Sequence, residues 1–233
     1  MLKGFVAILA ILCITLNSIP LTAEGADEAL DDQPHKGLTV NFELELTSIK
    51  QVLSDLALVH VKIANAYTDH KNYEEAIPWA NMAVRLDPAS TEANLILGIV
   101  SFRIRNTVQA ISSFEKIIEL DPTNFDAHFY LGRMYSGRDK PSLAVEYLTH
   151  AIEWAVSSED LSMAYSYRGL AYSVMQRYEE CFSDLDQAQS IDPDNWMIEL
   201  VRGTAIDSMN MHMNSASDHL GDRGFGRGVS FSP

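Results

Sequence analysis

The sequence predicts an all-α solenoid that contains about four helix–turn–helix units and one extra C-terminal helix. The first observation is a period of 34 residues, because landmarks that recur at a fixed spacing are the signature of a repeat architecture. The second observation is helical spacing of the apolar residues within each period. The third is an Asp-Pro pair that recurs in successive periods. The landmarks that share the 34-residue spacing are Pro88 and Pro122, Gly98 and Gly132, and Ala110 and Ala144.

The first 23 residues have a different character from the rest of the chain. A single basic residue precedes an apolar run over residues 5–16, and a more polar segment follows as far as Ala23. This layout is typical of a secretory signal peptide that is cleaved near Ala23. The alternative is an uncleaved anchor over residues 4–19, although the apolar run is shorter than the roughly 20 residues that span a bilayer core. We therefore expect an exported protein, periplasmic or secreted, with no transmembrane span after signal removal.

The segment 24–46 is acidic and polar, which predicts a flexible lead-in. From Ile49 onward the apolar residues fall at helical spacing, so the repeat domain is expected to cover residues 47–209. Because this helical spacing begins before the first 34-residue period, the first helix of the array is expected to start early.

Within the repeat domain, residues 107–120 show how one period produces a helix and its end. The segment TVQAISSFEKIIEL places apolar side chains on one face and leaves polar side chains for the solvent. The following Asp121-Pro122 pair ends the helix, because proline disfavours helical geometry at the preceding residue and can itself begin the next helix. Small residues such as Gly98 and Gly132 lie inside helices, where each costs about 1 kcal/mol relative to alanine. We expect that a closely packed second helix compensates this cost, with Ala110 and Ala144 facing these two glycines.

The recurring small, aromatic and proline positions resemble those of the tetratricopeptide repeat. The match extends over roughly 57–209 of the chain, in units of about 57–90, 91–124, 125–158 and 162–195, with an extra helix over 196–209. The resemblance implies a right-handed superhelix whose leading helices line a concave groove that binds a segment of another protein. The residues that carry the resemblance are Ala64, Tyr67, Ala76, Ala83 and Pro88; Gly98, Ala110, Phe114 and Pro122; Leu131, Gly132, Tyr135, Ala144, Leu148 and Ala151; and Gly169, Tyr172, Cys181, Leu185, Ala188 and Pro193.

The resemblance also implies which side chains point into the groove. The apolar members could hold an extended or helical segment, and the two arginines could bind its acidic groups through paired hydrogen bonds. The structural alternative is that some of the apolar members belong to the core and that Arg133 pairs with Asp126. The predicted groove residues are Asn65, Asp69, Leu95, Ile99, Phe102, Arg103, Phe129 and Arg133.

Composition and motifs argue against several classes of function. The formal net charge of −15 disfavours binding to nucleic acids, because these are themselves negatively charged. The sequence contains no phosphate-binding glycine loop, no HExxH, no CxxC and no nucleophile elbow, so neither an enzyme nor a cofactor is predicted. Removal of the signal would leave Cys181 as the only cysteine, for which a buried packing role is expected.

The C-terminal region suggests two further functions. The extra helix 196–209 lacks a second helix, and repeat arrays normally end in a polar cap, so this end could mediate homo-oligomer formation. Residues 210–233 are polar and glycine-rich, which predicts a disordered tail. Thioether and imidazole groups can bind monovalent copper, and a weaker alternative is therefore metal handling through Met209, Met211, His212 and Met213.

Overall fold

The structure, a computed structural model, describes residues 36–137 and 140–221. The predicted signal peptide lies outside the described residues. The chain divides into one unit that ends at Leu46 and a second unit that begins at Thr47, and the second unit contains the repeats. Within the described residues the regular elements are all helices: α2 (Lys36–Asp69), α3 (Tyr73–Leu86), α4 (Thr91–Arg103), α5 (Thr107–Leu120), α6 (Phe125–Tyr135), α7 (Pro141–Trp154), α8 (Ser158–Val174), α9 (Tyr178–Ile191) and α10 (Trp196–Gly221).

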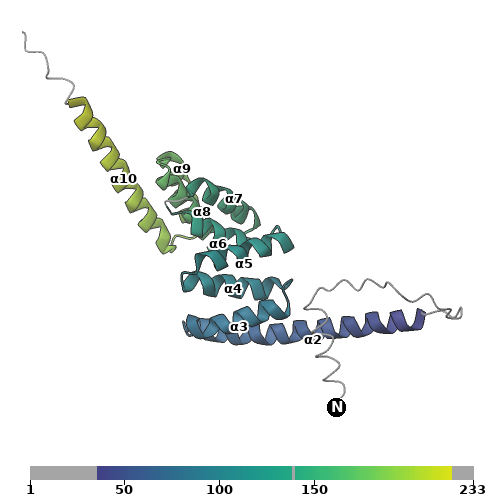
Figure 1. The fold of residues 1–233 in the computed structure, drawn as a ribbon. Helices are drawn as coiled ribbons and strands as arrows, with labels where there is room; N and C mark the ends of the chain where they lie inside the picture. The colour runs from purple at the N-terminus through teal and green to yellow at the C-terminus, as the bar shows by residue number, and fades with distance from the viewer. Residues whose placement is uncertain (1–35, 138–139, 222–233) are drawn as a thin grey trace, which may run out of the picture. The chain divides into compact units, whose positions relative to one another are not determined.

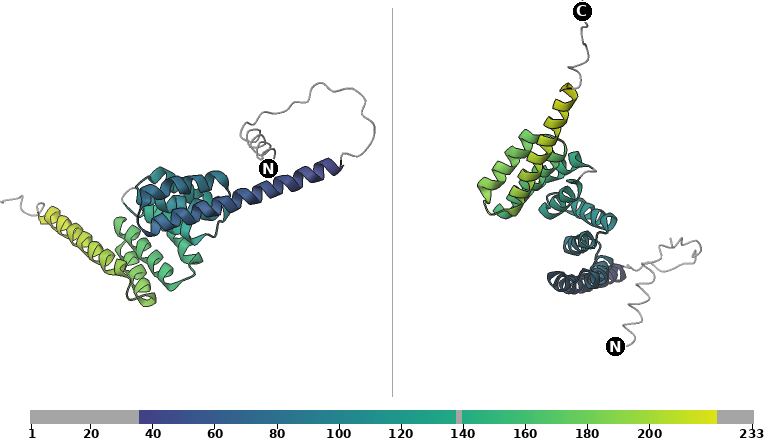
Figure 2. Two further views of the ribbon diagram at one scale, coloured as in Figure 1. Left: turned by 90° about the horizontal axis from the view of Figure 1, so that it is seen from below. Right: turned by 90° about the vertical axis from the view of Figure 1, so that its left-hand side faces the viewer.

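From Thr47 onward, the helices form successive pairs that stack side by side, as the period predicted (Figures 1 and 2). The pairs are α4 with α5, α6 with α7, and α8 with α9, and each pair contacts the next. The end of α2 shares a hydrophobic core with α3 and α4, through Val61, Ala64, Ala76, Ala80 and Ile96. The chain is therefore an all-α solenoid with an extra helix, α10, which packs against α8 and α9.

The recurring Asp-Pro pair forms the turn that joins one helix pair to the next. Asp87, Asp121 and Asp192 each follow the last residue of a second helix and adopt an extended backbone. The carboxylate of each aspartate accepts a hydrogen bond from the backbone N–H two residues later, at 3.2, 3.1 and 3.1 Å respectively. The proline that follows each aspartate has no backbone N–H that needs a hydrogen-bond acceptor. A polar side chain then caps the next helix in all three cases, from Ser90, Asn124 and Asn195.

The glycines inside the leading helices allow the second helix of each pair to approach closely. A Cβ atom at Gly98 would lie 2.7 Å from Cε1 of Phe114, and one at Gly132 would overlap Cγ of Leu148. At Gly169 it would lie 3.3 Å from the carbonyl oxygen of Cys181. The expected compensation for the helical glycines is therefore present, because each glycine allows a large residue of the paired helix to pack against its backbone.

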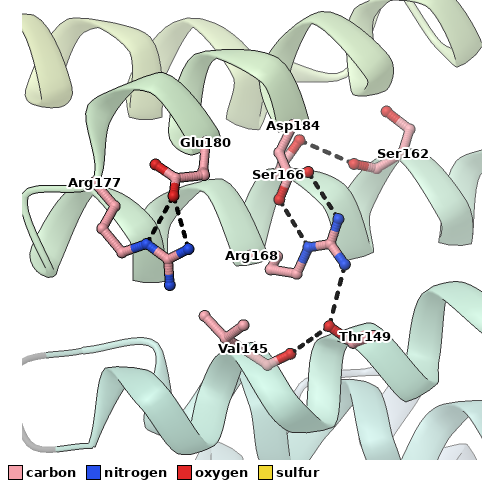
Figure 3. A network of polar contacts seen from close by, with 8 residues as sticks. All are labelled: Val145, Thr149, Ser162, Ser166, Arg168, Arg177, Glu180 and Asp184. Atoms are coloured by element: carbon pink, nitrogen blue, oxygen red, sulfur yellow. Dashed lines mark hydrogen bonds and ion pairs between the residues drawn. The ribbon is translucent and has the colours of Figure 1, made fainter.

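A polar network joins α7, α8 and α9 (Figure 3). Arg168 donates two hydrogen bonds to Asp184 and a third, of 3.1 Å, to Oγ1 of Thr149. Thr149 in turn donates to the carbonyl oxygen of Val145 at 2.7 Å. The network therefore connects the pair α6–α7 to the pair α8–α9.

The structure corrects two predictions about the ends of the repeat domain. Helix α2 begins at Lys36, so residues 36–46 of the predicted flexible lead-in are helical. Helix α10 continues to Gly221, so the predicted disordered tail does not begin at 210. In both places a continuous helix satisfies backbone hydrogen bonds within the segment itself and needs no second helix to do so. Polar composition alone therefore does not prevent helix formation in these two segments.

A buried polar junction holds the start of α10. The side chain of Asn195 donates to Oγ of Ser162 at 2.8 Å and to Oγ of Ser166 at 3.1 Å, and its own oxygen accepts from the backbone N–H of Met197. Ser162 donates to the carbonyl oxygen of Ala188 in α9. Asn195 thus connects the first turn of α10 to both helices of the preceding pair.

Candidate functional site

A hollow of about 370 Å³ lies between α2 and α4. Its apolar walls come from one face of each helix, because residues three or four apart along a helix share a face. Asn65, Lys62 and Glu92 contribute polar groups to this mostly apolar hollow. The complete lining is Leu58, Val61, Lys62, Asn65, Glu92, Leu95, Ile96 and Ile99, which we call the α2–α4 hollow.

Along the leading helices from α4 to α8, four aromatic rings form a second part of the site, which we call the aromatic cluster: Phe102, Phe129, Tyr130 and Tyr167. Tyr130 makes edge contacts with Phe102 and Phe129, with ring centroids 6.1 and 5.7 Å apart. Phe129 makes a further edge contact with Tyr167 at 5.5 Å. Edge-to-face geometry is favourable for aromatic pairs, since the positive edge of one ring meets the negative face of the other.

Arg133 lies among these rings and connects three consecutive leading helices. Its guanidinium carbon lies 5.0 Å from the centroid of Phe102 in α4 and 5.2 Å from that of Tyr167 in α8. A guanidinium over an aromatic face is attracted by the electrons of the ring. Within the described residues, Arg133 makes no ion pair with a carboxylate, so the considered pair with Asp126 does not form.

Arg103 is the second cation of the site. Its side chain is exposed, and its guanidinium carbon lies 6.0 Å from the ring centroid of Tyr73. It too makes no ion pair with a carboxylate in the described part of the chain. Neither Arg103 nor Arg133 is therefore neutralised by an ion pair with a described residue, in a chain whose net charge is −15.

Burial determines the protonation of the neighbouring groups. It raises the pKa of Tyr130, as does the negative charge of Asp126, while Arg103 and Arg133 oppose the shift. Burial also raises the pKa of Tyr167, against the effect of the same two arginines. The pKa of Asp126 is raised by burial and by the charge of Asp160. Both phenols therefore stay neutral at physiological pH and keep a proton that can be donated to an acceptor.

The structure brings most of the predicted groove residues together, in two groups that share α4. Asn65, Leu95 and Ile99 line the α2–α4 hollow, whereas Phe102, Phe129 and Arg133 belong to the aromatic cluster or contact it. Leu95 and Ile99 are half-buried and also pack against the core beneath α4. They therefore match the alternative that some apolar residues of the predicted groove belong to the core. Asp69 is exposed and is not part of the hollow lining.

The sequence reasoning missed two residues of the aromatic cluster, Tyr130 and Tyr167. Both occupy the sixth position of their predicted units, 125–158 and 162–195, which the resemblance did not assign to the groove. A comparison of the units with one another would have identified them, because two tyrosines at the same unit position are an internal repeat of their own.

The residues of the metal-binding alternative all lie on helix α10. Met209, His212 and Met213 are three and four residues apart, so they share one side of the helix, whereas Met211 points to another side. Copper binding by these residues stays a prediction.

Among the described residues, no helix combines the length and the apolarity needed to cross a membrane. Among them there is also no group of three or more histidine, cysteine, aspartate or glutamate side chains placed to hold a metal ion.

Comparison with known proteins identifies the repeats. Residues 57–90 and residues 113–146 each match a family model described as tetratricopeptide repeat. Over 97 residues the chain is 32% identical to the type IV pilus assembly protein PilF of Pseudomonas aeruginosa. This match covers 42% of the chain but only 37% of that protein.

Solved structures show the same fold. The structure of PilF from Pseudomonas aeruginosa matches with a TM-score of 0.60 and 16% identity, over 76% of this chain and 79% of PilF. A crystal structure of the MamA protein matches with a TM-score of 0.55 and 20% identity, over 77% of this chain and 99% of MamA. The type IV pilus biogenesis factor PilW matches with a TM-score of 0.57 and 15% identity, over 70% of this chain and 78% of PilW.

Proposed function

This chain is a tetratricopeptide-repeat protein, and we propose that it is a non-catalytic adaptor that holds a segment of a partner protein in the concave groove of its leading helices. The groove consists of the α2–α4 hollow and the aromatic cluster. Its apolar walls would receive apolar side chains of the segment, and Arg103 and Arg133 would bind acidic side chains or a terminal carboxylate.

The observation that carries this proposal is that the groove presents two arginines, Arg103 and Arg133, neither of which forms an ion pair with a described residue. A long cationic side chain within an aromatic cluster loses part of its hydration, and the rings return only part of that energy. An acidic group of a partner would form charge-assisted hydrogen bonds with the planar guanidinium of Arg133. Tyr130 and Tyr167, which stay protonated, could add neutral hydrogen bonds to the same group.

We further propose that the adaptor acts outside the cytoplasm in the assembly of a larger structure. The predicted signal peptide supports export. The similarity to proteins named for type IV pilus assembly and biogenesis supports an assembly role. The partner is proposed to be a protein or peptide rather than a nucleic acid, because a nucleic acid would be repelled by the strongly acidic chain.

The groove can be tested by photo-crosslinking in the native organism. A photoreactive residue would replace Ile99, which lines the hollow, or Val108, which is exposed on α5 and lies outside the groove. We expect a crosslinked partner peptide at position 99 and none at position 108. The peptide that mass spectrometry identifies would then be synthesised, and its affinity for the protein measured by calorimetry.

A pair of charge-matched variants makes the binding test specific. Phe129→Glu with Arg133→Glu changes the charge of the groove by the same amount as Val108→Glu with Lys116→Glu changes that of the α5 surface. We expect the groove variant to weaken peptide binding by at least about 100-fold, or about 2.7 kcal/mol, and the α5 variant to have little effect. Helicity is measured by circular dichroism for both. Equal affinity in the two variants would exclude the groove as the binding site.

A further inference from the structure

The glycine at the eighth position of the units 91–124, 125–158 and 162–195 marks where a second helix packs. Gly98, Gly132 and Gly169 each lie beneath the residue sixteen positions later in the chain, which is Phe114, Leu148 or Leu185. The second helices that carry these residues, α5, α7 and α9, contain 14 residues each. In three successive pairs, therefore, a large apolar residue of a 14-residue helix covers the bare backbone of a glycine.

Gly203 occupies the same position in α10, and this glycine is uncovered. A Cβ atom at Gly203 would have no atom of the described residues within 4 Å. The second helix that follows the first three glycines is missing here because α10 does not turn back after Gly203 but continues to Gly221. The residue sixteen positions later, at 219, belongs to α10 itself.

The side chains around Gly203 form an open, partly apolar face. Trp196 and Leu200 lie two turns and one turn before Gly203 on the same side of α10, and they are 64% and 53% exposed. The corresponding residues of α8 are Ser162 and Ser166, and both are 0% exposed. We call Trp196, Glu199, Leu200, Gly203 and Asp207 the open face of α10.

The charges of the open face disfavour a second copy as its occupant. Glu199 and Asp207 are both exposed and make no ion pair with any described residue. If two α10 helices packed antiparallel about Gly203, Glu199 of each copy would face Asp207 of the other. Like charges one turn to each side of the contact would oppose this pairing. A helix with cationic residues at those places would instead be attracted.

We propose that the open face of α10 is a second docking site, which binds one amphipathic helix of a partner protein antiparallel to α10 and so completes a fifth helix pair. The partner helix places a large apolar residue on Gly203, and lysine or arginine residues one turn before and after it face Asp207 and Glu199. This site is separate from the groove, because it uses the side of α10 that would face a second helix of its own unit.

The proposal is tested with the full chain and a stapled 14-residue helical peptide, the length of α5, α7 and α9. The peptide has phenylalanine at its centre and a lysine one turn before and after it, and its affinity is measured by fluorescence anisotropy. A control peptide has alanine in place of the phenylalanine. We expect measurable binding of the first peptide and binding weaker by at least about tenfold for the control.

Variants of α10 then locate the binding. Gly203→Leu fills the space above the helix without a clash, so the protein should unfold at no lower temperature than the unaltered chain and lose at least about tenfold in affinity for the peptide. Glu199→Lys with Asp207→Lys should weaken binding by a similar factor. The groove variant Phe129→Glu with Arg133→Glu should bind the peptide as tightly as the unaltered chain, which separates this site from the groove.

Three results would overturn the proposal. The first is no binding of the phenylalanine peptide at concentrations up to about 1 mM. The second is equal affinity of Gly203→Leu and the unaltered chain. The third is a dimer in sedimentation experiments that Gly203→Leu converts to a monomer, because the open face would then be occupied by a second copy.

Discussion

Arg168 of α8 and Asp184 of α9 are joined by two parallel hydrogen bonds, from Nε to Oδ2 and from Nη2 to Oδ1, each 2.8 Å long. The pair lies mostly out of solvent, with side chains 17% and 8% exposed. Arg168 also lies near the rings of Tyr165 and Tyr172, at 5.4 and 5.9 Å. A two-point contact of this kind fixes the relative position of two helices more strictly than apolar packing does.

The first prediction concerns this ion pair. Asp184→Ala should lower the free energy of unfolding by about 3 kcal/mol, because it leaves the guanidinium of Arg168 buried without its carboxylate. Urea denaturation followed by circular dichroism measures the change. Combining Asp184→Ala with Arg168→Met should restore much of the loss, since both charges are then removed.

A surface pair provides the control for the first prediction. Arg177 and Glu180 form a bond of the same chemical kind, with Nη2 and Oε1 2.7 Å apart, but both side chains are largely solvated (Figure 3). Glu180→Gln should therefore change stability little. If it destabilised the protein as much as Asp184→Ala, burial would not be the reason for the effect.

The second prediction compares glycines at one unit position. Gly132→Ala should destabilise the protein by about 1–3 kcal/mol, because the new methyl group overlaps Leu148. Gly203→Ala should stabilise it by about 1 kcal/mol, because that position is open and alanine favours a helix. Thermal unfolding of the two variants measures both effects. Changes of the same sign would contradict the packing difference between α6 and α10.

The third prediction concerns pH. Burial lowers the pKa of His128 below its ordinary value of 6.5, and its Nε2 lies 2.9 Å from the carbonyl oxygen of Pro122. The unfolded chain therefore binds a proton at a higher pH than the folded chain does, so stability should be lost as the pH falls below about 6.5. His128→Gln should make the stability less dependent on pH between about 7 and 5.

Denaturation series at several pH values test the third prediction. The matched control is His70→Gln, since His70 is exposed near the end of α2. We expect that variant to keep the pH dependence of the unaltered chain. A slope that is the same in all three proteins would show that His128 does not link protonation to folding.

The fourth prediction concerns Cys181. Its side chain is 0% exposed and forms no disulfide, and burial raises the pKa of its thiol to about 11. Because the thiolate is the reactive form, a thiol reagent at about pH 8 should modify Cys181 only as fast as the protein unfolds. The measurement uses a Cys13→Ser background, so that Cys181 alone gives the signal. Rapid modification of the folded protein would contradict its burial.

Much of the fold could be predicted from the sequence, since its signals are local. Asp-Pro at 87–88 and 121–122 ends one helix and positions the next through bonds that span two residues. The glycine period likewise predicted close helix pairs. The sequence did not predict which residue covers each glycine. Ala110 and Ala144 were expected to face Gly98 and Gly132, whereas the contacts come from Phe114 and Leu148.

The candidate site could be predicted only in part. Asn65, Leu95, Ile99, Phe102, Phe129 and Arg133 were predicted from their positions in the units, and each of them lines the α2–α4 hollow, belongs to the aromatic cluster or contacts it. The contacts among them link different helix pairs, as when Arg133 lies between the rings of Phe102 and Tyr167. Such contacts depend on how the leading helices are rotated and spaced, which a linear pattern does not specify.

The sequence by itself determined that this protein is a stack of paired helices, because helix periodicity, proline stops and glycine spacing act over a few residues along the chain. Only the tertiary structure decided that Arg168 is paired with Asp184, that Arg103 and Arg133 form no ion pair with a described residue, and that Gly203 alone of its series lies open. These properties depend on contacts between different helices. The spatial separation and the burial of the side chains decide whether a charge is neutralised or a helix backbone is covered.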